Sequence, residues 1–427
     1  MACWCCCSVE EPLEDSYQPW DGAPAAASSL PPLAYGAPPV GVGDFDVLSV
    51  LGRGAYGKVV QVRRRATGEL FAMKVMRKAD VVRRHQVRHA LTERELLQFI
   101  HHPFIVPLHF AFQSETHLYL VLALQSGGEL FFHLKRDGAF AEPRARLYAA
   151  EILLALEAIH AAGYAYRDLK PENVLLDSEG HVVLSDFGLA KGRVSALDAG
   201  GTTFCGTPSY MAPEVLLCLG HGIAVDWWSL GTLLYEMLSG CPPFYSRNLH
   251  QMYRAILTAE LRVGPHISRA ARAILCGLLT RDPLRRLGAR GAGEVRKSAF
   301  FRRLDFKKVY ARGYAPPFKP TLVGASPSSQ ALDTSNFDAR FTGEDLLGTA
   351  DDAPTSPTAA NGDDAAAFGG AVQQQRADEG AQQPAQEEGA EAYASAAEQR
   401  ALFASWSYFS LQAASMKQAA LPSPNVL

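Results

Sequence analysis

Three glycines stand close together in the sequence GRGAYGKV at residues 52–59, spaced as Gly-x-Gly-x-x-Gly. Glycine allows the backbone to approach phosphate oxygens closely and to offer them N–H groups. In a dinucleotide-binding fold this motif would open a helix, but here the alternating sequence KVVQV follows it. The pattern therefore favours a turn between two strands that covers the phosphates of a nucleotide. On this motif alone, a plain glycine-rich turn is an equally good interpretation.

A lysine and a glutamate further along could bind and fix those phosphates. Lys74 lies in the strand-like sequence FAMKV, and Glu93 follows nineteen residues later in the helix-like sequence ALTERELL. The ammonium of Lys74 could hold the α- and β-phosphates if the carboxylate of Glu93 fixed its position. The alternative for Glu93 is a solvated acid on a helix face that pairs with a nearby arginine, and position alone favours that alternative.

The sequence YRDLKPEN at 166–173 carries groups that phosphoryl transfer needs. Asp168 could orient or accept the proton of an attacking hydroxyl, Lys170 could neutralise the transferred phosphoryl group, and Asn173 could bind a metal ion. Asp186, in an Asp-Phe-Gly sequence thirteen residues after Asn173, could chelate Mg²⁺. Found in this order after the glycine motif, these groups predict phosphoryl transfer.

Hydrophobic periodicity places these residues in two regions of different texture. Residues 44–124 contain five strand-like segments, several of which alternate apolar and polar residues, and one helix with an apolar stripe. After Gly128 the chain is mostly amphipathic helices, with apolar side chains three and four positions apart. The sequence therefore predicts a strand-rich unit followed by a helical one. The expected strands are 44–50, 58–62, 70–75, 108–112 and 117–124, and the expected helices are 89–100, 145–160, 225–239 and 270–279.

Together these motifs resemble those of the eukaryotic protein kinases, and the resemblance covers residues 44–301 with every catalytic motif intact. It implies an α+β, two-lobed fold, with a β-rich N-lobe and one main helix over 44–124 and a helical C-lobe over 125–301. It also implies ATP and Mg²⁺ as cofactors and a non-specific serine/threonine protein kinase activity in signal transduction. The catalytic residues would be Lys74, Glu93, Asp168, Lys170, Asn173 and Thr207, and the metal ligands would be Asn173 and Asp186.

The same resemblance assigns the residues that would bind the nucleotide. Leu122 would be the gatekeeper, and backbone groups near Ala123 and Gln125 would meet the edge of the adenine. Val59 and Ala72 would lie against its faces. The complete set would be Leu51, Gly52, Arg53, Gly54, Ala55, Tyr56, Gly57, Lys58, Val59, Ala72, Lys74, Leu122, Ala123, Gln125 and Glu129.

Details around the catalytic motifs resemble the AGC group of protein kinases. YRDLKPEN, with Tyr166 where many kinases have histidine, is typical of that group, and TFCGTPSYMAPE at 203–214 is close to its activation segment. The resemblance implies that Thr203 is phosphorylated and that the added negative charge pairs with Arg167. An ordinary loop hydroxyl is the alternative for Thr203.

Three supporting roles follow from the same resemblance. Thr207 would hydrogen-bond the catalytic aspartate and lysine, and Asp226 would brace the catalytic loop. Glu214 would form a structural ion pair with Arg281 in the sequence RDPLRRLG.

Residues 302–427 resemble the C-terminal tail of AGC kinases. Ser356, in PTSP, matches the turn-motif phosphosite, and FASWSY at 403–408 fits the hydrophobic motif, with Ser407 as its phosphosite. In the family the aromatics of this motif fill a groove on the N-lobe. A surface amphipathic helix with aromatics on one face is the alternative for this segment.

Other stretches of the tail bear on the subgroup. FKP at 318–320 and SNFDARFTGE at 335–344 are tail motifs, and the latter favours the p70 ribosomal-protein kinases over Akt (protein kinase B), the two expected nearest relatives. A relative that belongs to neither branch is the alternative. A low-complexity insert at 346–392 separates the two tail phosphosites more widely than in those relatives.

Three carboxylates suggest a preference for basic substrates. Glu129, Glu172 and Glu236 match family residues that face basic side chains upstream of the acceptor. Arginine and carboxylate groups pair in a bidentate, directional way. The sequence therefore predicts acceptors preceded by arginine three, and also five, residues upstream. A solvated or structural acid is the alternative for Glu236.

The charge distribution limits the classes of partner. The chain of 427 residues has a net charge of −3, but residues 1–43 carry −5 and residues 320–427 carry −10, which leaves about +12 on residues 44–319. A basic body suits anionic ligands such as nucleotide phosphates or an acidic lipid surface. A nucleic-acid-binding protein is a weaker alternative, because no basic patch with interleaved aromatics supports it.

The expected partners are protein substrates and an upstream kinase of the phosphoinositide-dependent type, with no nucleic acid, and the chain is expected to be a monomer. The main rival class is a pseudokinase scaffold that binds partners without turnover. The intact active-site residues argue against that class; they are Lys74, Asp168, Asn173 and Asp186.

The first 43 residues are rich in proline and alanine, and they predict a flexible leader. No apolar run of membrane-spanning length and no secretory signal is present, so a cytoplasmic location is expected. Acylation of a cysteine cluster near the start would add membrane association; a metal cluster or unmodified thiols are the alternatives. The cluster consists of Cys3, Cys5, Cys6 and Cys7.

Overall fold

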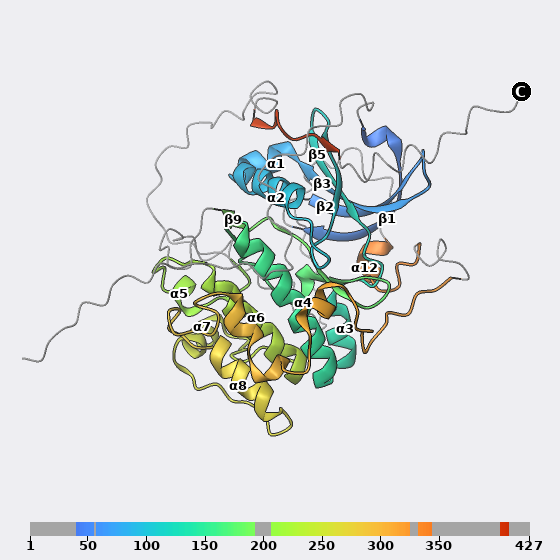
Figure 1. Ribbon diagram of the computed structural model, residues 1–427. Helices are drawn as coiled ribbons and strands as arrows, with labels where there is room; N and C mark the ends of the chain where they lie inside the picture. The colour runs from blue at the N-terminus through green and yellow to red at the C-terminus, as the bar shows by residue number, and fades with distance from the viewer. Residues whose placement is uncertain (1–39, 55–56, 193–205, 325–331, 344–401, 410–427) are drawn as a thin grey trace, which may run out of the picture.

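The structure is a computed structural model that describes residues 40–54, 57–192, 206–324, 332–343 and 402–409. A strand-rich N-lobe lies above a larger helical C-lobe in Figure 1. The predicted two-lobed α+β fold is thereby confirmed. Several predicted site residues lie outside the described residues: Ala55, Tyr56, Thr203, Ser356, Cys3, Cys5, Cys6 and Cys7. The insert at 346–392 and most of 1–43 also lie outside them.

The N-lobe is built on one antiparallel sheet with the strand order β1-β2-β3-β5-β4-β10. The first five strands match the five that the sequence predicts. The sixth comes from the C-terminal tail, where the aromatic spacing also allowed a helix. The strands are β1 (Phe45–Gly54), β2 (Gly57–Arg64), β3 (Leu70–Arg77), β4 (Leu108–Gln113), β5 (His117–Ala123) and β10 (Tyr408–Phe409).

Strand β5 shows why both faces of this sheet are buried. Its Leu118, Leu120 and Leu122 belong to the large core that continues into the C-lobe. Its Tyr119 and Val121 belong to a separate cluster on the opposite face. Successive side chains of a strand point to opposite faces. An apolar run such as HLYLVLA therefore indicates a central strand whose two faces are both covered.

Two helices accompany the sheet in the N-lobe. Helix α2 (Val87–Phe99) corresponds to the predicted main helix, and the shorter α1 (Lys78–Arg83) precedes it. The buried Leu96 and Leu97 fix α2 against the core. This packing turns Glu93, on the same helix, toward the sheet.

The C-lobe is mainly helical, with short strands near the junction of the lobes. Its helices are α3 (Leu130–Asp137), α4 (Glu142–Ala161), α5 (Pro213–Leu216), α6 (Ala224–Ser239), α7 (Leu249–Thr258), α8 (Arg269–Leu278), α9 (Ala292–Arg296) and α10 (Phe306–Tyr310). Its strands are β6 (Tyr164–Ala165), β7 (Val174–Leu176), β8 (Val182–Leu184) and β9 (Lys191–Gly192). Three single turns of 3₁₀ helix lie in the described C-lobe, namely η2 (Pro171–Asn173), η3 (Pro208–Tyr210) and η4 (Ala299–Phe301), and η1 (Val42–Asp44) precedes β1 in the N-lobe.

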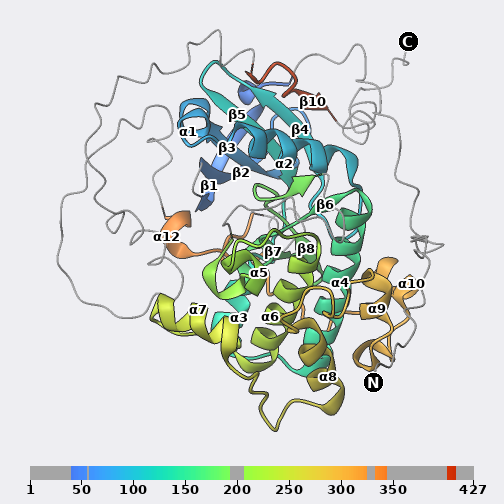
Figure 2. The same ribbon diagram turned by 90° about the vertical axis from the view of Figure 1, so that its left-hand side faces the viewer.

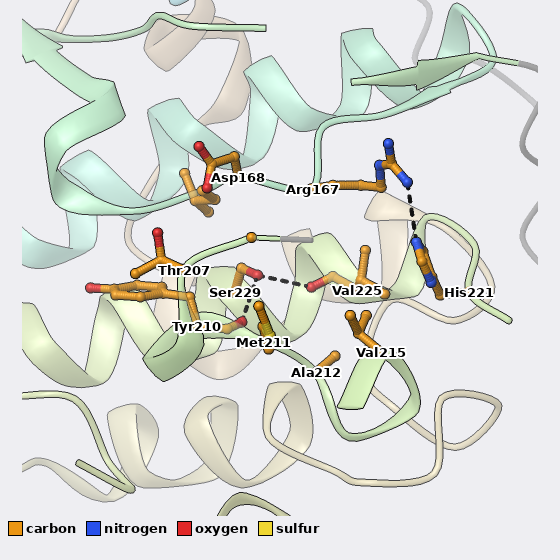
Figure 3. Close-up of a pocket in the computed structure, with 12 residues that line it drawn as sticks. Arg167, Asp168, Thr207, Tyr210, Met211, Ala212, Val215, His221, Val225 and Ser229 are labelled. Atoms are coloured by element: carbon orange, nitrogen blue, oxygen red, sulfur yellow. Dashed lines mark hydrogen bonds between the residues drawn. The ribbon is translucent and has the colours of Figure 1, made fainter. Parts of the chain in front are cut away.

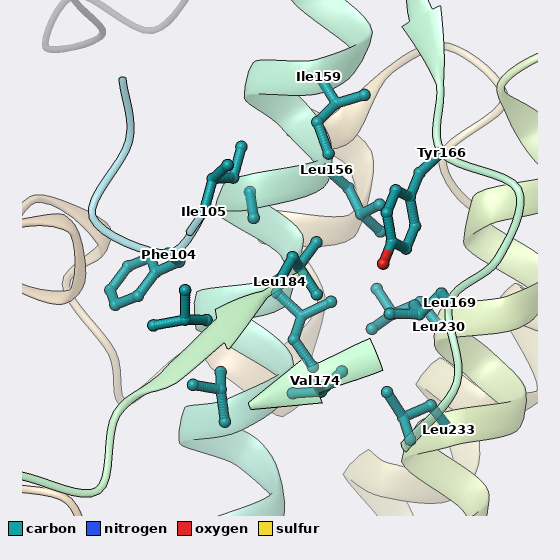
Figure 4. Close-up of a cluster of buried hydrophobic side chains, with 14 of the residues drawn as sticks. Phe104, Ile105, Leu156, Ile159, Tyr166, Leu169, Val174, Leu184, Leu230 and Leu233 are labelled. Carbon is teal, nitrogen blue, oxygen red and sulfur yellow. The ribbon is translucent and has the colours of Figure 1, made fainter. Parts of the chain in front are cut away.

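The C-lobe core lies between α4, α6 and the β7–β8 hairpin, as Figure 4 shows. Leu156 of α4 and Leu230 of α6 are fully buried there, together with Tyr166 of the loop that follows β6. Leu184 at the end of β8 bonds through its carbonyl to the backbone N–H of Val106, at 2.9 Å. The core therefore supports the loops that leave β6 and β8, which carry the predicted chemistry.

The described parts of the tail contact both lobes. Figure 2 shows α12 (Ala339–Thr342) and β10 on opposite sides of the N-lobe. Helix α12 packs near β1, whereas β10 pairs with β4 at the other end of the sheet order.

Within the described parts of the chain, no helix has the length and hydropathy needed to cross a bilayer.

Candidate active site

Two carboxylates hold the ammonium group of Lys74. The residue lies in β3, paired across the sheet with Val59 and Leu120. Its Nζ lies 2.7 Å from Oε1 of Glu93 in α2 and 3.0 Å from Oδ1 of Asp186. Burial opposes the ammonium charge, but Asp186 and Glu93 outweigh it and raise the pKa of Lys74. Because Glu93 is only 2% exposed, its interpretation as a solvated helix acid is wrong.

Asp168, Lys170 and Asn173 meet in the loop that follows β6. Nζ of Lys170 lies 2.9 Å from Oδ2 of Asp168, and Nδ2 of Asn173 donates to the same oxygen at 2.8 Å. Burial raises the pKa of Asp168, and Asp186 adds to the effect, although Lys170 and Asn173 oppose it. A carboxylate with a raised pKa next to a lysine is suited to receive a proton from a hydroxyl group.

The buried Asp226 of α6 fixes the backbone of this loop. Arg167 has a φ of +66°, a conformation that costs energy for any residue other than glycine. Asp226 accepts the backbone N–H of Arg167 at 2.7 Å and that of Tyr166 at 2.9 Å. Nε2 of His160 lies 2.7 Å from Oδ2 of Asp226, the oxygen that also accepts from Tyr166. These bonds offset the strain, as the loop-bracing role predicts.

Asp186 and Asn173 each keep an oxygen that has no hydrogen bond to another described residue and could bind a cation. The amide NH₂ of Asn173 donates to both Oδ2 and the carbonyl of Asp168, so its Oδ1 remains. Oδ1 of Asp186 accepts from Lys74 and from the N–H of Gly188. Burial alone would raise the pKa of Asp186, but Lys74 and the Gly188 bond lower it, so the group is a carboxylate. This donor set fits Mg²⁺, which prefers such oxygens.

The glycine motif forms a β-hairpin. Gly52 pairs with Val59, and Gly54 pairs with Gly57, across β1 and β2. The dinucleotide-binding alternative is therefore excluded, because no helix begins at the motif. A Cβ on Gly57 would lie only 1.8 Å from the carbonyl oxygen of Val75, so only glycine fits where β2 passes this closely to β3.

The predicted adenine-side residues lie where β5 leaves the sheet. Ala72 of β3 pairs with Leu122 of β5, and the chain continues to Gln125. The tail crosses here: Nδ2 of the buried Asn336 donates to the carbonyl of Ser126 at 3.3 Å. The remaining described residues of the predicted set lie on the strands of this sheet or just after it. Leu51 and Arg53 belong to β1, Lys58 to β2 and Ala123 to the end of β5, and Glu129 comes immediately before α3.

The three predicted substrate carboxylates lie close enough to affect one another. Burial, Glu172 and Asp338 raise the pKa of Glu129 to about 7. Burial and Glu172 raise the pKa of Glu236 to about 8. Tyr210 also donates its hydroxyl to Glu236. Oε2 of Glu172 is buried without a partner among the described residues. Such a cluster is short of positive charge, which a basic ligand would supply.

The predicted partner of Glu214 is wrong. Its carboxylate pairs with Arg286 through two bonds of 2.7 and 2.8 Å. Arg281 instead donates to backbone carbonyls around the end of α7. Both arginines belong to RDPLRRLG, and the turn at 281–287 directs Arg286 into the interior of the C-lobe. The sequence could not choose between them, because the choice depends on the direction of that turn.

The tail segment 402–409 lies against the N-lobe. Phe403 and Trp406 are fully buried, with their rings perpendicular and 6.2 Å apart between centroids. Trp406 donates its indole N–H to the carbonyl of Tyr119 at 3.2 Å. Gln113 donates to the carbonyl of Phe403 at 2.8 Å. Ser407 next to them is exposed, so its hydroxyl is accessible.

Basic residues from separate elements surround Arg167, and the sequence motifs identified only Arg167 itself. Figure 3 shows its guanidinium next to His221 in a pocket that also contains Asp168 and Thr207. Arg167 contributes to the lowered pKa of His89 in α2, after burial. Lys191 of β9 acts in the same way on His221. Because these basic residues come from a helix, a strand and two loops that are far apart in the sequence, no motif could have revealed this cluster.

The chain is similar to known protein families and proteins. The protein kinase domain family matches residues 45–301, and the protein kinase C terminal domain matches residues 329–370. Protein kinase 2 of Dictyostelium discoideum is 53% identical over 67% of this chain and 60% of its own length. Serine/threonine-protein kinase YPK1 of Saccharomyces cerevisiae is 50% identical over 72% of this chain and 44% of its own length.

A third relative is covered more completely. Serine/threonine-protein kinase Sgk1 of Danio rerio is 47% identical over 70% of this chain and 68% of its own length. The chain belongs to the protein kinase family, as a serine/threonine kinase of the AGC group with that group's C-terminal domain.

The similarity within that group is to kinases of the YPK and Sgk type. It does not single out the p70 ribosomal-protein kinases, which the tail sequence favoured, or Akt, the other expected relative. This chain spans 60% of the length of protein kinase 2 and 44% of the length of YPK1.

Proposed function

We propose that this chain transfers the γ-phosphoryl group of ATP to serine and threonine side chains of proteins. The observation that carries the proposal is the joint placement of two charged groups of residues. Lys74 bridges Glu93 and Asp186, while Asp168 contacts Lys170 at 2.9 Å. Phosphoryl transfer depends on positioning and charge neutralisation, and these residues supply both.

Each residue of the second group has a separate task. Asp168 orients the acceptor hydroxyl and receives its proton. Lys170, beside it, stabilises negative charge on the phosphoryl group as it moves. Thr207, which lines the same pocket as Asp168, supports the position of these two side chains.

The nucleotide is held by the N-lobe and the start of the C-lobe. Lys74 would contact the α- and β-phosphates of ATP, and backbone N–H groups of the glycine motif would cover them. The adenine would bind between the lobes, near Ala72 and Leu122. Mg²⁺ bound by Asn173 and Asp186 would supply further neutralisation of the phosphates.

The acceptor sequence is basic. Glu129 and Glu236 have raised pKa values because their carboxylates are buried near Glu172. An arginine of the substrate would supply the missing positive charge and would return these groups to their ionised form. This supports arginine three and five residues upstream of the acceptor.

Phosphorylation regulates the activity. Thr203 lies in the activation segment and Ser407 in the tail segment that packs on the N-lobe, and Ser356 is the turn-motif site. An upstream kinase of the phosphoinositide-dependent type would modify Thr203. Arg167 and Lys191 support a phosphate on Thr203, because both positive charges act on His221 in this part of the pocket.

The organisation follows from these roles. The kinase domain spans 44–301, with lobes at 44–124 and 125–301, and the regulatory tail spans 302–427 with its hydrophobic motif at 403–408. The protein acts as a cytoplasmic monomer in signalling. Acylation of the cysteines at positions 3, 5, 6 and 7 would bring it to membranes.

A transfer assay tests the proposal. The full chain, phosphorylated at Thr203, is given Mg-ATP and an Arg-x-Arg-x-x-Ser peptide, and Asp168→Asn is the matched control. We expect transfer that disappears in Asp168→Asn and falls when the upstream arginines become alanine. A folded wild-type chain that binds ATP but phosphorylates neither peptide would instead support the pseudokinase scaffold.

A further inference from the structure

His221 lies beside Arg167 in the pocket that Figure 3 shows. Its ring Nε2 is 3.3 Å from Nη1 of Arg167, and the residue is 5% exposed. A guanidinium group has only donors. Nε2 of His221 is therefore the acceptor, and the proton of the neutral ring is on Nδ1.

The surroundings of His221 keep its ring neutral. Burial, Arg167 and Lys191 lower its pKa to about 4, although Glu214 and Asp226 act in the opposite direction. At neutral pH the ring therefore carries no charge and keeps an acceptor lone pair. Arg167 gains a hydrogen bond from this neighbour without meeting a second positive charge.

A second contact completes the placement of the guanidinium. Nε of Arg167 donates to the carbonyl of Leu189 at 2.8 Å. Two of its five N–H groups are thus used, one on Nε and one on Nη1. Nη2 has no partner within the described part of the chain. The remaining N–H groups of Nη1 and Nη2 form the fork that binds phosphate oxygens in a bidentate way.

The same stretch of chain holds both the backbone and the side chain of Arg167. His221 lies just before α6, and Asp226 in α6 accepts the backbone N–H of Arg167 at 2.7 Å. Glu214, seven residues before His221, is anchored by Arg286. The end of the activation segment is thereby tied to the loop that carries Asp168.

We propose that His221 is a positioning residue that sets the response of the kinase to phosphorylation of Thr203. It does so by orienting the Arg167 guanidinium so that the free fork meets the phosphate. This inference rests on the proposed regulation at Thr203 and adds to it the group that prepares the arginine. Without His221, the guanidinium keeps its Leu189 contact as its one hydrogen bond to the described residues, and it must be ordered when the phosphate arrives.

Two substitutions of the full chain test the role, each prepared with threonine or phosphothreonine installed at position 203. His221→Phe keeps the ring shape but removes the acceptor, whereas His221→Gln places an amide oxygen near the position of Nε2. We expect the activation ratio, phosphorylated over unphosphorylated, to fall about tenfold in His221→Phe, as for the loss of one charge-assisted hydrogen bond. His221→Gln should retain most of the ratio.

His181→Phe is the matched control, because His181 is also 5% exposed and bonds to Glu151 rather than to Arg167. It should lower thermal stability and leave the activation ratio unchanged. An equal ratio in wild type and His221→Phe would overturn the inference.

Phosphorus NMR gives a readout that is independent of activity. The second pKa of a free phosphothreonine is about 6, and a guanidinium fork should lower it in the wild-type chain. His221→Phe should move it back toward 6. If phosphorylation fails to activate even the wild type, the proposed regulation is wrong, while the titration still tests the positioning. Identical titrations in the two proteins would reject the positioning role.

Discussion

The buried charges of this kinase are held in pairs whose members come from distant parts of the chain. Arg286 is 1% exposed and Glu214 is 5% exposed, and they share two hydrogen bonds. Transfer of each ion from water into a protein costs several kcal/mol, and the cost is offset only while both partners are present. The pair therefore fixes the end of the activation segment to the turn before α9.

Removing one member of this pair should destabilise the C-lobe strongly. Glu214→Ala leaves the Arg286 guanidinium buried without its carboxylate, so we expect a loss of about 3–5 kcal/mol in the free energy of unfolding. Urea denaturation measures it. Glu179→Ala is the control, because Glu179 pairs with Lys319 and the two side chains are 63% and 61% exposed, and exposed pairs contribute about 0–1 kcal/mol. Equal losses in the two variants would contradict the importance of the buried pair.

The raised pKa values of two substrate carboxylates predict a pH-dependent KM. Glu129 has a pKa of about 7 and Glu236 of about 8. Only the ionised forms attract arginine, so protonation below these values weakens binding. The KM for an arginine-containing peptide should therefore rise roughly five- to tenfold as the pH falls from about 8 to about 6. Steady-state kinetics at several pH values measures this rise.

Two controls isolate the cause. A peptide whose upstream arginines are replaced by alanine should show little change of KM over the same range, and Glu129→Gln should reduce the slope for the arginine peptide. A KM that rises equally for both peptides would assign the pH dependence to another group.

At the scale of elements, the short strand β10 closes an edge of the N-lobe sheet. It pairs with β4 through Tyr408 and Ala111 and through Phe409 and Phe110. An open edge strand presents unpaired backbone groups, and β4 would be such an edge without the tail. Because Phe403 and Trp406 are buried immediately before β10, the apolar contact and the strand pairing support one another.

Trp406→Ala should detach this segment. The side chain is fully buried, and truncation of a buried tryptophan costs about 3–5 kcal/mol. We expect a lower Tm and faster hydrogen exchange of the β4 amides. Leu402→Ala is the control, since Leu402 is 44% exposed and its loss should change neither quantity. Slow β4 exchange retained in Trp406→Ala would show that β10 pairs without its aromatic neighbour.

The sequence predicts those elements and residues whose signal is local. Strand-like segments, several of them alternating and one a continuous apolar run, predict the five N-lobe strands, and YRDLKPEN places Asp168 two residues before Lys170. Contacts made by the turns of the chain leave no local signal. The choice of Arg286 over Arg281 and the contact of His221 with Arg167 depend on the path of the backbone between elements. Burial of Glu93 likewise depends on how α2 packs, so its position alone favoured the solvated interpretation.

At the scale of the whole molecule, the tail joins the two lobes. Phe318 packs against the guanidinium of Arg144 in the C-lobe, 3.9 Å from its carbon to the ring centroid. Asn336 bonds to the chain between the lobes, and Phe341 packs against the N-lobe cluster. Trp406 then contacts the far side of the N-lobe sheet. The described tail residues thus contact both lobes and the connection between them.

A chain that ends at residue 343 should therefore lose stability mainly in the N-lobe. Its β4 edge and the site of Phe403 and Trp406 would be exposed, so we expect a lower Tm and self-association through β4. Calorimetry and sedimentation velocity measure the two effects. A synthetic peptide of residues 400–410, added in excess, should reverse both by binding the folded state. The same peptide with alanine at positions 403 and 406 should have no effect, because it lacks the buried aromatics; reversal by the alanine peptide would show that backbone pairing alone suffices.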